Sequence, residues 1–375
     1  MKPARRTMTA AVASNERPAL GVVRRVAVFR ALQLGDLLCS VPALRALRTG
    51  LPQAVITLIG LPWAATFAQR FSCYVDRFLA FPGTEGLPEQ ENDPVALDRF
   101  FALAHAQRFD LALQMHGNGA ITNGVVGTLG ARVSMGFCRP DSPNPDPQRL
   151  LPYPEADSEI WRQLRLMAFL GLPLQGDALE FPISPEEHRC AMQLMKETGL
   201  KSGEYVCVHP GARAPARRWP TDRFADVAGA IADLGLSVVL TGSAGEAALT
   251  RLVHRQMRRR SIDLAGRTSL GTVAALISRA KLLISNDTGV SHIAAALRVP
   301  SVIVYSGSSP ARWAPANRLL HRAAFHEVSC RPCSHYRCPI GHPCARELSA
   351  EQVREQALAL LNSLGKHQCT SQSGS

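Results

Sequence analysis

The feature that most constrains the fold of this 375-residue sequence is its alternation of strand-like and helix-like segments. Short apolar runs of strand length recur along both halves, and amphipathic stretches typical of helices separate them. This alternation is typical of α/β proteins, in which helices cover a parallel sheet. The predicted strands are Arg25–Phe29, Ala54–Ile59, Arg77–Phe81, Asp110–Met115 and Arg132–Gly136, then Tyr205–His209, Ser237–Thr241, Ile262–Leu264, Lys281–Ser285 and Ser301–Tyr305.

The segment from Pro173 to Pro185 separates the two halves and is predicted to link two domains, 21–175 and 176–347. Two similar α/β units joined by a short linker leave a cleft, and open α/β sheets bind ligands at the carboxyl ends of their strands. A last helix, within 348–365, could pack across either domain. The two ends, 1–20 and 366–375, are predicted to be a disordered lead and tail.

The formal net charge of +12 favours a negatively charged partner. Nucleic acid is disfavoured, because aromatic residues make up only 6% of the chain and the sequence has no recognition-helix or zinc-finger pattern. The basic run from Arg255 to Arg260 is expected to be solvated near a helix end, with contact to a membrane surface as the alternative. The first twenty residues are basic but lack the apolar region of a signal peptide, so the sequence predicts a cytoplasmic location.

One predicted strand–turn–helix unit has the properties of a phosphate site. After the apolar run Lys281–Ser285, the residues Asn286, Asp287 and Thr288 are suited to cap a helix, and Gly289 gives the turn flexibility. The free N–H groups at a helix start favour an anion. His292 follows one turn later on the face of Thr288, where a packed structural role is the more common one.

Other loops of the second half could contribute to the same anion site. Gly211 lies in a Pro-Gly turn that leads to Arg213, Arg217 and Arg218, and guanidinium groups bind phosphate oxygens in a bidentate manner. Plain surface charge is the alternative for these arginines. After the turn at Gly242, Glu246 could accept hydrogen bonds from ribose hydroxyls, or could simply be an acid at a helix N-terminus.

The first predicted strand is followed by Gln33, Gly35 and Asp36, directly before a helix. Asp36 has two readings of similar weight: a helix cap, or a carboxylate at the cleft that accepts a proton from an incoming hydroxyl. Gly35 would let the backbone come close to a ligand. The Gly-x-Gly-x-x-Gly fingerprint of dinucleotide-binding folds is missing from this turn, which disfavours a nicotinamide or flavin oxidoreductase.

A cluster of cysteines near the C-terminus is a candidate zinc site. Cys330, Cys333, Cys338 and Cys344 lie within fifteen residues, and four thiolates can bind zinc tetrahedrally. Their spacing is looser than that of two Cys-x2-Cys pairs. A reduced structural loop or an occasional disulfide is therefore the preferred interpretation.

Taken together, these motifs resemble glycosyltransferase family 9, which includes the ADP-heptose:lipopolysaccharide heptosyltransferases. The resemblance runs in order from about Arg25 to Leu364. It rests on five blocks of sequence: Gln33 to Leu44, His209 to Ala212, Arg217 to Pro220, Thr241 to Gly242, and Ser285 to His292.

The resemblance implies a GT-B fold, in which two Rossmann-like domains face each other across a cleft and a C-terminal helix returns toward the first domain. It implies an inverting transfer without a required metal or cofactor, from a nucleotide-diphosphate sugar such as ADP-heptose to a lipopolysaccharide core or similar surface glycan. The positive charge would suit a phosphorylated acceptor at the inner face of a membrane, with the protein in peripheral contact with that membrane.

In this resemblance Asp36 is the catalytic base, and Arg217 stands where the family usually has Lys beside the donor diphosphate. The other donor-binding positions are Arg218, Glu246, Asp287, Thr288, Gly289, His292, Gly211 and Gly242. The expected acceptor-side positions are Gln33, Gly35, Gly117 and Asn118, together with the loops Gly83–Asp93 and Arg139–Gln148. A sugar-nucleotide 2-epimerase and a non-catalytic sugar-nucleotide-binding protein are the alternative functions.

Overall fold

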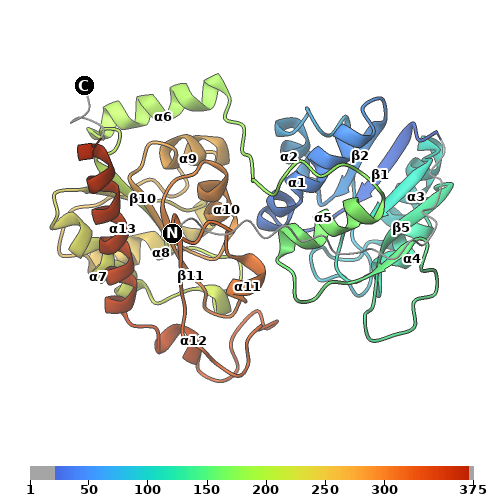
Figure 1. Cartoon of the computed structure of the whole chain (residues 1–375). Coiled ribbons are helices and arrows are strands. Elements are labelled where there is room, and N and C mark those ends of the chain that lie inside the picture. The colour runs from blue at the N-terminus through green and yellow to red at the C-terminus, as the bar shows by residue number, and fades with distance from the viewer. Residues whose placement is uncertain (1–21, 371–375) are drawn as a thin grey trace.

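The structure, a computed structural model, describes residues 22–370, with side chains described to residue 363. Its first half forms a parallel six-stranded sheet in the order β3-β2-β1-β4-β5-β6 (Figure 1). The strands are β1 (Arg25–Phe29), β2 (Val55–Gly60), β3 (Arg77–Ala80), β4 (Leu111–Gln114), β5 (Val133–Cys138) and β6 (Leu150–Pro152). The helices of this half are α1 (Leu34–Gly50), α2 (Ala65–Arg70), α3 (Pro94–Gln107), α4 (Thr122–Gly127) and α5 (Glu159–Phe169), with a 3-10 turn at Pro62–Ala64.

The second half repeats this topology in a parallel sheet of order β12-β11-β10-β7-β8-β9. Its strands are β7 (Tyr205–His209), β8 (Ser237–Leu240), β9 (Ile262–Asp263), β10 (Leu282–Asn286), β11 (Ser301–Val304) and β12 (His321–Ala324). The helices are α6 (Pro185–Thr198), α7 (Thr221–Ala232), α8 (Ala247–Gln256), α9 (Leu270–Ile277), α10 (Gly289–Ala296), α11 (Pro310–Trp313), α12 (Pro343–Arg346) and α13 (Ala350–Thr370). Two 3-10 turns, η2 (Pro215–Arg217) and η3 (Ala244–Glu246), precede α7 and α8.

Both sheets therefore have the strand order of a Rossmann fold, and the prediction of two parallel α/β units is confirmed. The ten predicted strands are all present, with ends that match the prediction or differ by one or two residues. Most of them are buried apolar runs, whereas β3 and β9 are only partly buried. The edge strands β6 and β12 were not predicted. Both are short, and they contain proline or arginine where an apolar run would be expected.

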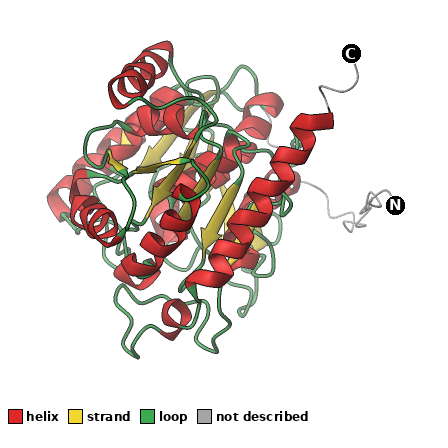
Figure 2. Cartoon of the chain, turned by 90° about the vertical axis from the view of Figure 1, so that its left-hand side faces the viewer, coloured by secondary structure: helices red, strands yellow, loops and turns green. Residues whose placement is uncertain are grey.

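The C-terminal helix α13 packs on the second sheet. Its buried residues Val353, Ala357, Leu360 and Leu361 join the core formed with α7 and strands β10 and β11. Figure 2 shows this helix lying across the strands of that sheet. The family resemblance implied a return toward the first domain, whereas residues 350–363 stay with the second. The helix also continues to Thr370, so the tail predicted from residue 366 is helical as far as that residue. The predicted disordered lead and residues 371–375 lie outside the described residues.

The two halves meet where the first turns of α1 and α10 pack against each other. A Cβ atom added at Gly289 would lie 2.6 Å from Cδ2 of Leu34, and one added at Gly35 would lie 3.0 Å from Cδ2 of His292. Glycine at these two positions therefore permits a close approach of the helix starts.

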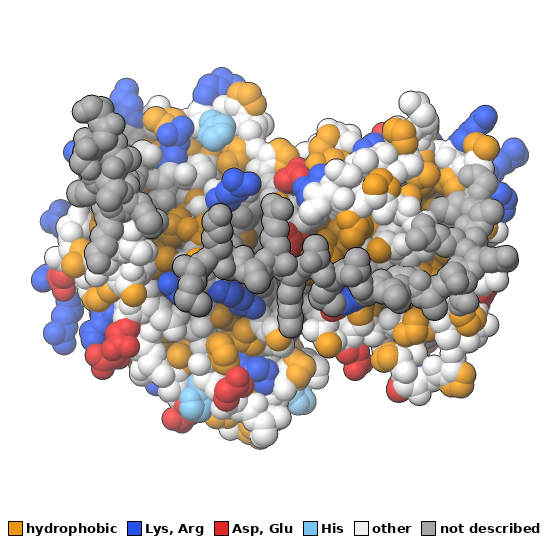
Figure 3. Space-filling model, in the orientation of Figure 1, with side chains coloured by type: hydrophobic (Ala, Val, Ile, Leu, Met, Phe, Trp, Pro, Cys, Tyr) orange, Lys and Arg blue, Asp and Glu red, His pale blue; other side chains and the backbone are white. Residues whose placement is uncertain are grey.

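Positively charged side chains are spread over both halves of the face in Figure 3 instead of forming one patch. Within residues 22–370, no helix is both long enough and apolar enough to cross a membrane.

Candidate active site

A cleft of about 470 Å³ lies between the two halves and contains residues from both. It opens at the carboxyl ends of β1, β7 and β10, where strand order reverses in each sheet. This is the place where open α/β sheets bind ligands. The lining residues are Leu32, Gln33, Leu34, Gly35, Asp36, Glu89, His209, Ala212, Arg213, Ala214, Arg217, Glu246, Asp287, Thr288, Gly289, Val290, His292 and Trp313.

The turn between β10 and α10 forms one wall of this cleft. Thr288 is the N-cap residue, as its extended backbone shows, but among the described residues no side chain caps the helix. The hydroxyl of Ser291 donates to the Thr288 carbonyl over 2.7 Å instead. The Ser291 N–H also donates to the Thr288 carbonyl, at 3.0 Å, so among the described residues the N–H groups of Gly289 and Val290, which line the cleft, are the ones left for an anionic ligand.

Asn286 ties this turn to the neighbouring loop after β7. Its side chain is fully buried; Oδ1 accepts from the backbone N–H of Trp219 at 2.9 Å, and Nδ2 donates to the Pro210 carbonyl at 2.8 Å. The sequence suggested only a capping role for Asn286. In the structure it instead fixes the arginine-bearing loop beside the α10 N-terminus.

The arginines of that loop have different positions. Arg217 lines the cleft, and its Nη1 lies 3.6 Å from a carboxylate oxygen of Asp287. Arg213 also lines the cleft. Arg218 is not one of the described residues that line the cleft. Its Nε donates to the Ala212 carbonyl at 2.7 Å. Arg218 therefore braces the loop.

Glu246 is an acid at a helix N-terminus, and it also lines the cleft. Its Oε2 accepts from the Ser243 N–H at 2.8 Å, completing a capping box, and its carboxylate also faces the cleft. A Cβ at Gly211 would lie 2.1 Å from Oε1 of Glu246, so any side chain there would displace this carboxylate from its present position. Burial lowers the pKa of the neighbouring His209, although Glu246 opposes this shift. Gly242 lies outside the described lining and packs against Glu246.

Asp36 lies on the opposite wall, in the first turn of α1. Gln33 is the N-cap residue, so of the two readings of Asp36 the helix cap does not hold, although Asp36 is an acid in the first turn of the helix. Arg30, which directly follows β1 and is fully buried, donates to the Asp36 carbonyl from Nε at 2.9 Å and Nη2 at 2.7 Å. It also donates to the Met115 carbonyl. The turn that carries Asp36 is thereby held rigidly, and its carboxylate faces the cleft.

The environment of Asp36 makes its carboxylate a stronger base than usual. Burial raises the pKa of Asp36 to about 6, although the Arg30 guanidinium opposes the shift. A carboxylate with this pKa is ionised at neutral pH and can accept a proton in a transition state.

Glu159 and Arg312 extend the network around Asp36, and no sequence motif indicates either role. Glu159 begins α5, has a side chain only 3% exposed, and binds Arg30 at 2.9 Å. Arg312 from α11 of the other half binds the same carboxylate at 2.8 Å. Burial alone would raise the pKa of Glu159, but Arg30 and Arg312 lower it to about 2.

Four positions were predicted to lie on the acceptor side. Gln33 and Gly35 line the cleft, whereas Gly117 and Asn118 lie outside its described lining. Asn118 accepts from the Ala120 N–H at 3.2 Å within its own loop. Glu89, from the predicted loop Gly83–Asp93, reaches the cleft instead, and its Oε2 has no hydrogen-bond partner among residues 22–370.

The cysteine segment does not form the candidate zinc site. In the described part of the chain, no three His, Cys, Asp or Glu side chains are arranged to hold a metal. Cys330, Cys333, Cys338 and Cys344 are all free thiols. The segment braces η2, because Ala216 donates to the Tyr336 carbonyl at 3.1 Å and its own carbonyl lies 2.9 Å from Nε2 of His342.

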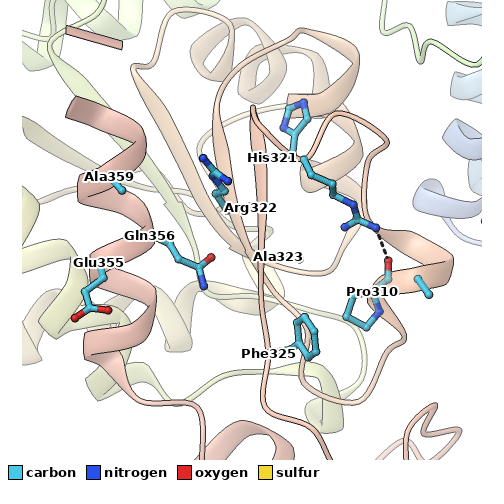
Figure 4. A pocket seen from close by; sticks show the side chains of 10 residues that line it. Pro310, His321, Arg322, Ala323, Phe325, Glu355, Gln356 and Ala359 are labelled. Atoms are coloured by element: carbon cyan, nitrogen blue, oxygen red, sulfur yellow. Dashed lines mark hydrogen bonds between the residues drawn. The ribbon is translucent and has the colours of Figure 1, made fainter. Parts of the chain in front are cut away.

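A larger groove lies between α13 and the start of α11, with β12 between them (Figure 4). Arg318, His321, Arg322 and Glu355 are among its lining residues. None of the site residues predicted from the sequence belongs to its described lining, so the interdomain cleft is the better candidate for chemistry.

Two Rossmann-like domains that face each other across a cleft at their strand-switch points define the GT-B class of α/β protein. Within this class, the chain belongs to glycosyltransferase family 9 (heptosyltransferase), whose family model matches residues 98–343.

Curated relatives match over shorter stretches. Lipopolysaccharide heptosyltransferase 2 of Escherichia coli is 40% identical over 107 residues, which are 27% of this chain and 30% of that protein. Lipooligosaccharide heptosyltransferase 2 of Campylobacter jejuni is 26% identical over 168 residues, or 43% of this chain and 53% of that protein. The matched stretches thus span about a third to a half of these relatives.

Solved structures match over nearly the whole chain. A family 9 glycosyltransferase from Veillonella parvula has a TM-score of 0.75 at 22% identity, covering 91% of this chain and 98% of that one. The E. coli ADP-heptose LPS heptosyltransferase II has a TM-score of 0.68 at 21% identity, covering 91% and 99%. At these identities the likeness supports the fold alone.

Proposed function

We propose that this protein is an inverting, metal-independent glycosyltransferase that transfers a heptose or a related sugar from a nucleotide-diphosphate donor to a lipopolysaccharide core or similar surface glycan. One observation carries the proposal. A carboxylate with a raised pKa, Asp36, and an uncapped helix start flanked by Arg217 line the same cleft from opposite domains.

In the proposed reaction, an acceptor hydroxyl gives its proton to the Asp36 carboxylate while its oxygen attacks the anomeric carbon of the donor. The bond between that carbon and the diphosphate oxygen breaks, and the diphosphate leaves with the bonding electrons. A single displacement of this kind inverts the configuration at the anomeric carbon. Arg217 and the N–H groups of α10 would stabilise the charge that develops on the leaving diphosphate.

ADP-heptose is the donor that we favour. The E. coli relative of similar fold is named an ADP-heptose LPS heptosyltransferase, and another E. coli heptosyltransferase, WaaC, has been solved with ADP. Glu246 would bind ribose hydroxyls, since its carboxylate lies at the cleft beside Gly211. Metal independence is proposed because cationic side chains and a helix N-terminus stand where a diphosphate would need positive charge.

The acceptor would enter from the first domain, past Gln33, Gly35 and Glu89. The net charge of +12 suits a phosphorylated lipid or oligosaccharide acceptor, with the protein in the cytoplasm and in peripheral contact with the inner membrane face. We propose no role in nucleic-acid binding. We further propose that residues 21–175 form the acceptor-side domain and 176–347 the donor domain.

The test is to incubate the purified protein with ADP-, UDP- and GDP-sugars and measure its melting temperature, then to add a heptose-deficient lipopolysaccharide core. The expected result is a rise in melting temperature with ADP-heptose and transfer that needs both substrates. Conversion of the donor without acceptor would indicate an epimerase instead. Donor binding without transfer to any core acceptor would indicate a non-catalytic binding protein.

A further inference from the structure

Arg312 is the residue through which the donor domain contacts the network around Asp36. From α11, its Nε donates to Oε2 of Glu159 at 2.9 Å, and its Nη2 lies 2.8 Å from the same oxygen. Nη2 also donates to the Tyr153 hydroxyl at 3.3 Å. Glu159 and Tyr153 both belong to the first half, so this contact crosses between the domains.

Glu159 has enough positive charge around it without Arg312. Arg30 binds it at 2.9 Å and Arg162 at 3.3 Å, and both of these arginine side chains are at most 5% exposed. Arg312 is therefore a third positive charge beside one buried carboxylate. The other carboxylate that this extra positive charge can stabilise is that of Asp36, whose backbone carbonyl accepts hydrogen bonds from Arg30.

Arg312 is also connected to the donor wall of the cleft. Its guanidinium stacks over the ring of the adjacent Trp313 at 4.6 Å, and Trp313 packs edge-on against His292. Trp313 and His292 both line the cleft. The position of Arg312 therefore depends on how the donor domain sits against the first domain.

We propose, on the basis of the proposed function, that Arg312 is a positioning residue: when the two domains are closed, Glu159 holds its guanidinium beside Asp36, and the added positive charge keeps the base ionised. The base is then complete only when the donor domain is docked. Acceptor deprotonation would thereby be coupled to a correctly placed donor.

The electrostatics around Asp36 agree with this role. Burial raises the pKa of Asp36; Arg30 and Arg312 oppose the rise, and Glu159 adds to it. The charged groups that act on Asp36 are Arg30 after β1, Glu159 on α5 and Arg312 on α11, and Cys39 on α1 also lies close to it. Around Glu159 and Cys39 lie Tyr153 after β6, Arg162 on α5, and Asp287 and His292 at the start of α10.

The experiment compares R312Q with R70Q. Arg70 of α2 forms a two-pronged ion pair with Glu187 of α6, so it also joins the two halves, but neither residue belongs to the described lining of the cleft. Loss of Arg312 should raise the pKa of Asp36 by about one unit. Because transfer needs ionised Asp36, the R312Q deficit at pH 6 should exceed its deficit at pH 8.5 by about fivefold.

R70Q should lose the same factor of activity at both pH values, and R312K should lie close to the wild type. If the R312Q deficit were equal at pH 6 and pH 8.5, Arg312 would be only a structural contact and the proposal would be wrong. An R70Q profile that shifted as far as that of R312Q would also overturn it.

A second measurement needs no substrate and so separates this inference from the proposed function. Urea unfolding at pH 8 is measured for the wild type, D36N, R312Q and the double variant. D36N removes the cost of keeping Asp36 ionised, so it should raise the urea midpoint more in the R312Q background than in the wild type. An equal rise in both backgrounds would contradict the coupling, whatever reaction the protein catalyses.

Discussion

The starts of α1 and α10 meet at the cleft between the two domains, and they use the same helix electrostatics in opposite ways. The first turn of α1 carries its own acid, Asp36. The first turn of α10 has no acidic residue, and among the described residues no side chain caps it. One helix start therefore holds a built-in carboxylate, and the other leaves its positive end available for an anion from outside.

This difference explains how two domains of equal topology can have unequal roles. In the first domain, the turn after the strand is held by the buried Arg30, which binds its backbone and leaves the Asp36 carboxylate facing the cleft. In the second, Asn286 clamps the neighbouring loop so that Arg217 stands beside the bare helix start. Variants that change one of the two helix starts test this contrast.

The largest effect is expected from D36N. The substitution keeps the size of the side chain but removes the base, so the transfer rate should fall by about 10²–10⁴-fold. Donor affinity, measured by calorimetry with ADP, should stay within about threefold of the wild type, since the proposed donor site lies at the other helix start. D98N, which changes an exposed carboxylate on α3, is the matched control and should keep full activity.

R217A tests the opposite wall. Removal of a charge-assisted contact to the diphosphate should weaken ADP binding by about 10–100-fold. R217K should recover much of the affinity, because it keeps the charge and loses only the bidentate geometry. R255Q removes the same charge from an exposed site on α8 and should leave binding unchanged. If R217A and R255Q lost equal ADP affinity, the donor would be attracted by the net charge of the protein and not by a local contact with Arg217.

G289A tests the close contact of the two helix starts. The new methyl group would lie 2.6 Å from Cδ2 of Leu34, which should cost about 1–3 kcal/mol of unfolding free energy. Chemical denaturation measures this loss. L34A removes the atom in the way, so the double variant should be more stable than the sum of the single changes predicts. Simple additivity would show that the helix starts are not in contact in solution.

The smallest effect concerns the stability cost of Asp36. Its pKa is raised to about 6 in the folded state, so ionisation destabilises the fold as the pH rises from about 4 to 6 and above. D36N should therefore be more stable than the wild type at pH 8, by about 1–2 kcal/mol after allowing for water in the cleft. The difference should shrink as the pH falls from about 6 and disappear below about pH 3, where Asp36 is neutral in both the folded and the unfolded state. A constant difference across this range would mean an ordinary pKa for Asp36.

The sequence was sufficient to predict the two sheets and most of the cleft. Strands such as β1 and β7 are continuous apolar runs, and their burial in a parallel sheet leaves a clear local pattern. Asp36, Arg217 and Thr288 could be placed at the cleft because each directly follows such a strand or its turn. Gly117 and Asn118 also follow a strand, but they are not among the described residues that line the cleft.

The ion-pair network around Asp36 could not be predicted in the same way. Arg30, Glu159 and Arg312 are separated by 129 and 153 residues and meet only through the packing of the two domains. The one local signal for this network was Arg30, a charged residue that directly follows a buried strand. Glu89 gave no signal, because its place depends on the path of an irregular loop.

The most direct test of the account is a crystal structure of the protein with ADP bound. The diphosphate should lie at the start of α10, within hydrogen-bond distance of the Gly289 or Val290 N–H and of Arg217, with Asp36 facing it across the cleft. A diphosphate bound in the groove beside β12, or an Asp36 carboxylate turned away from the nucleotide, would contradict the account.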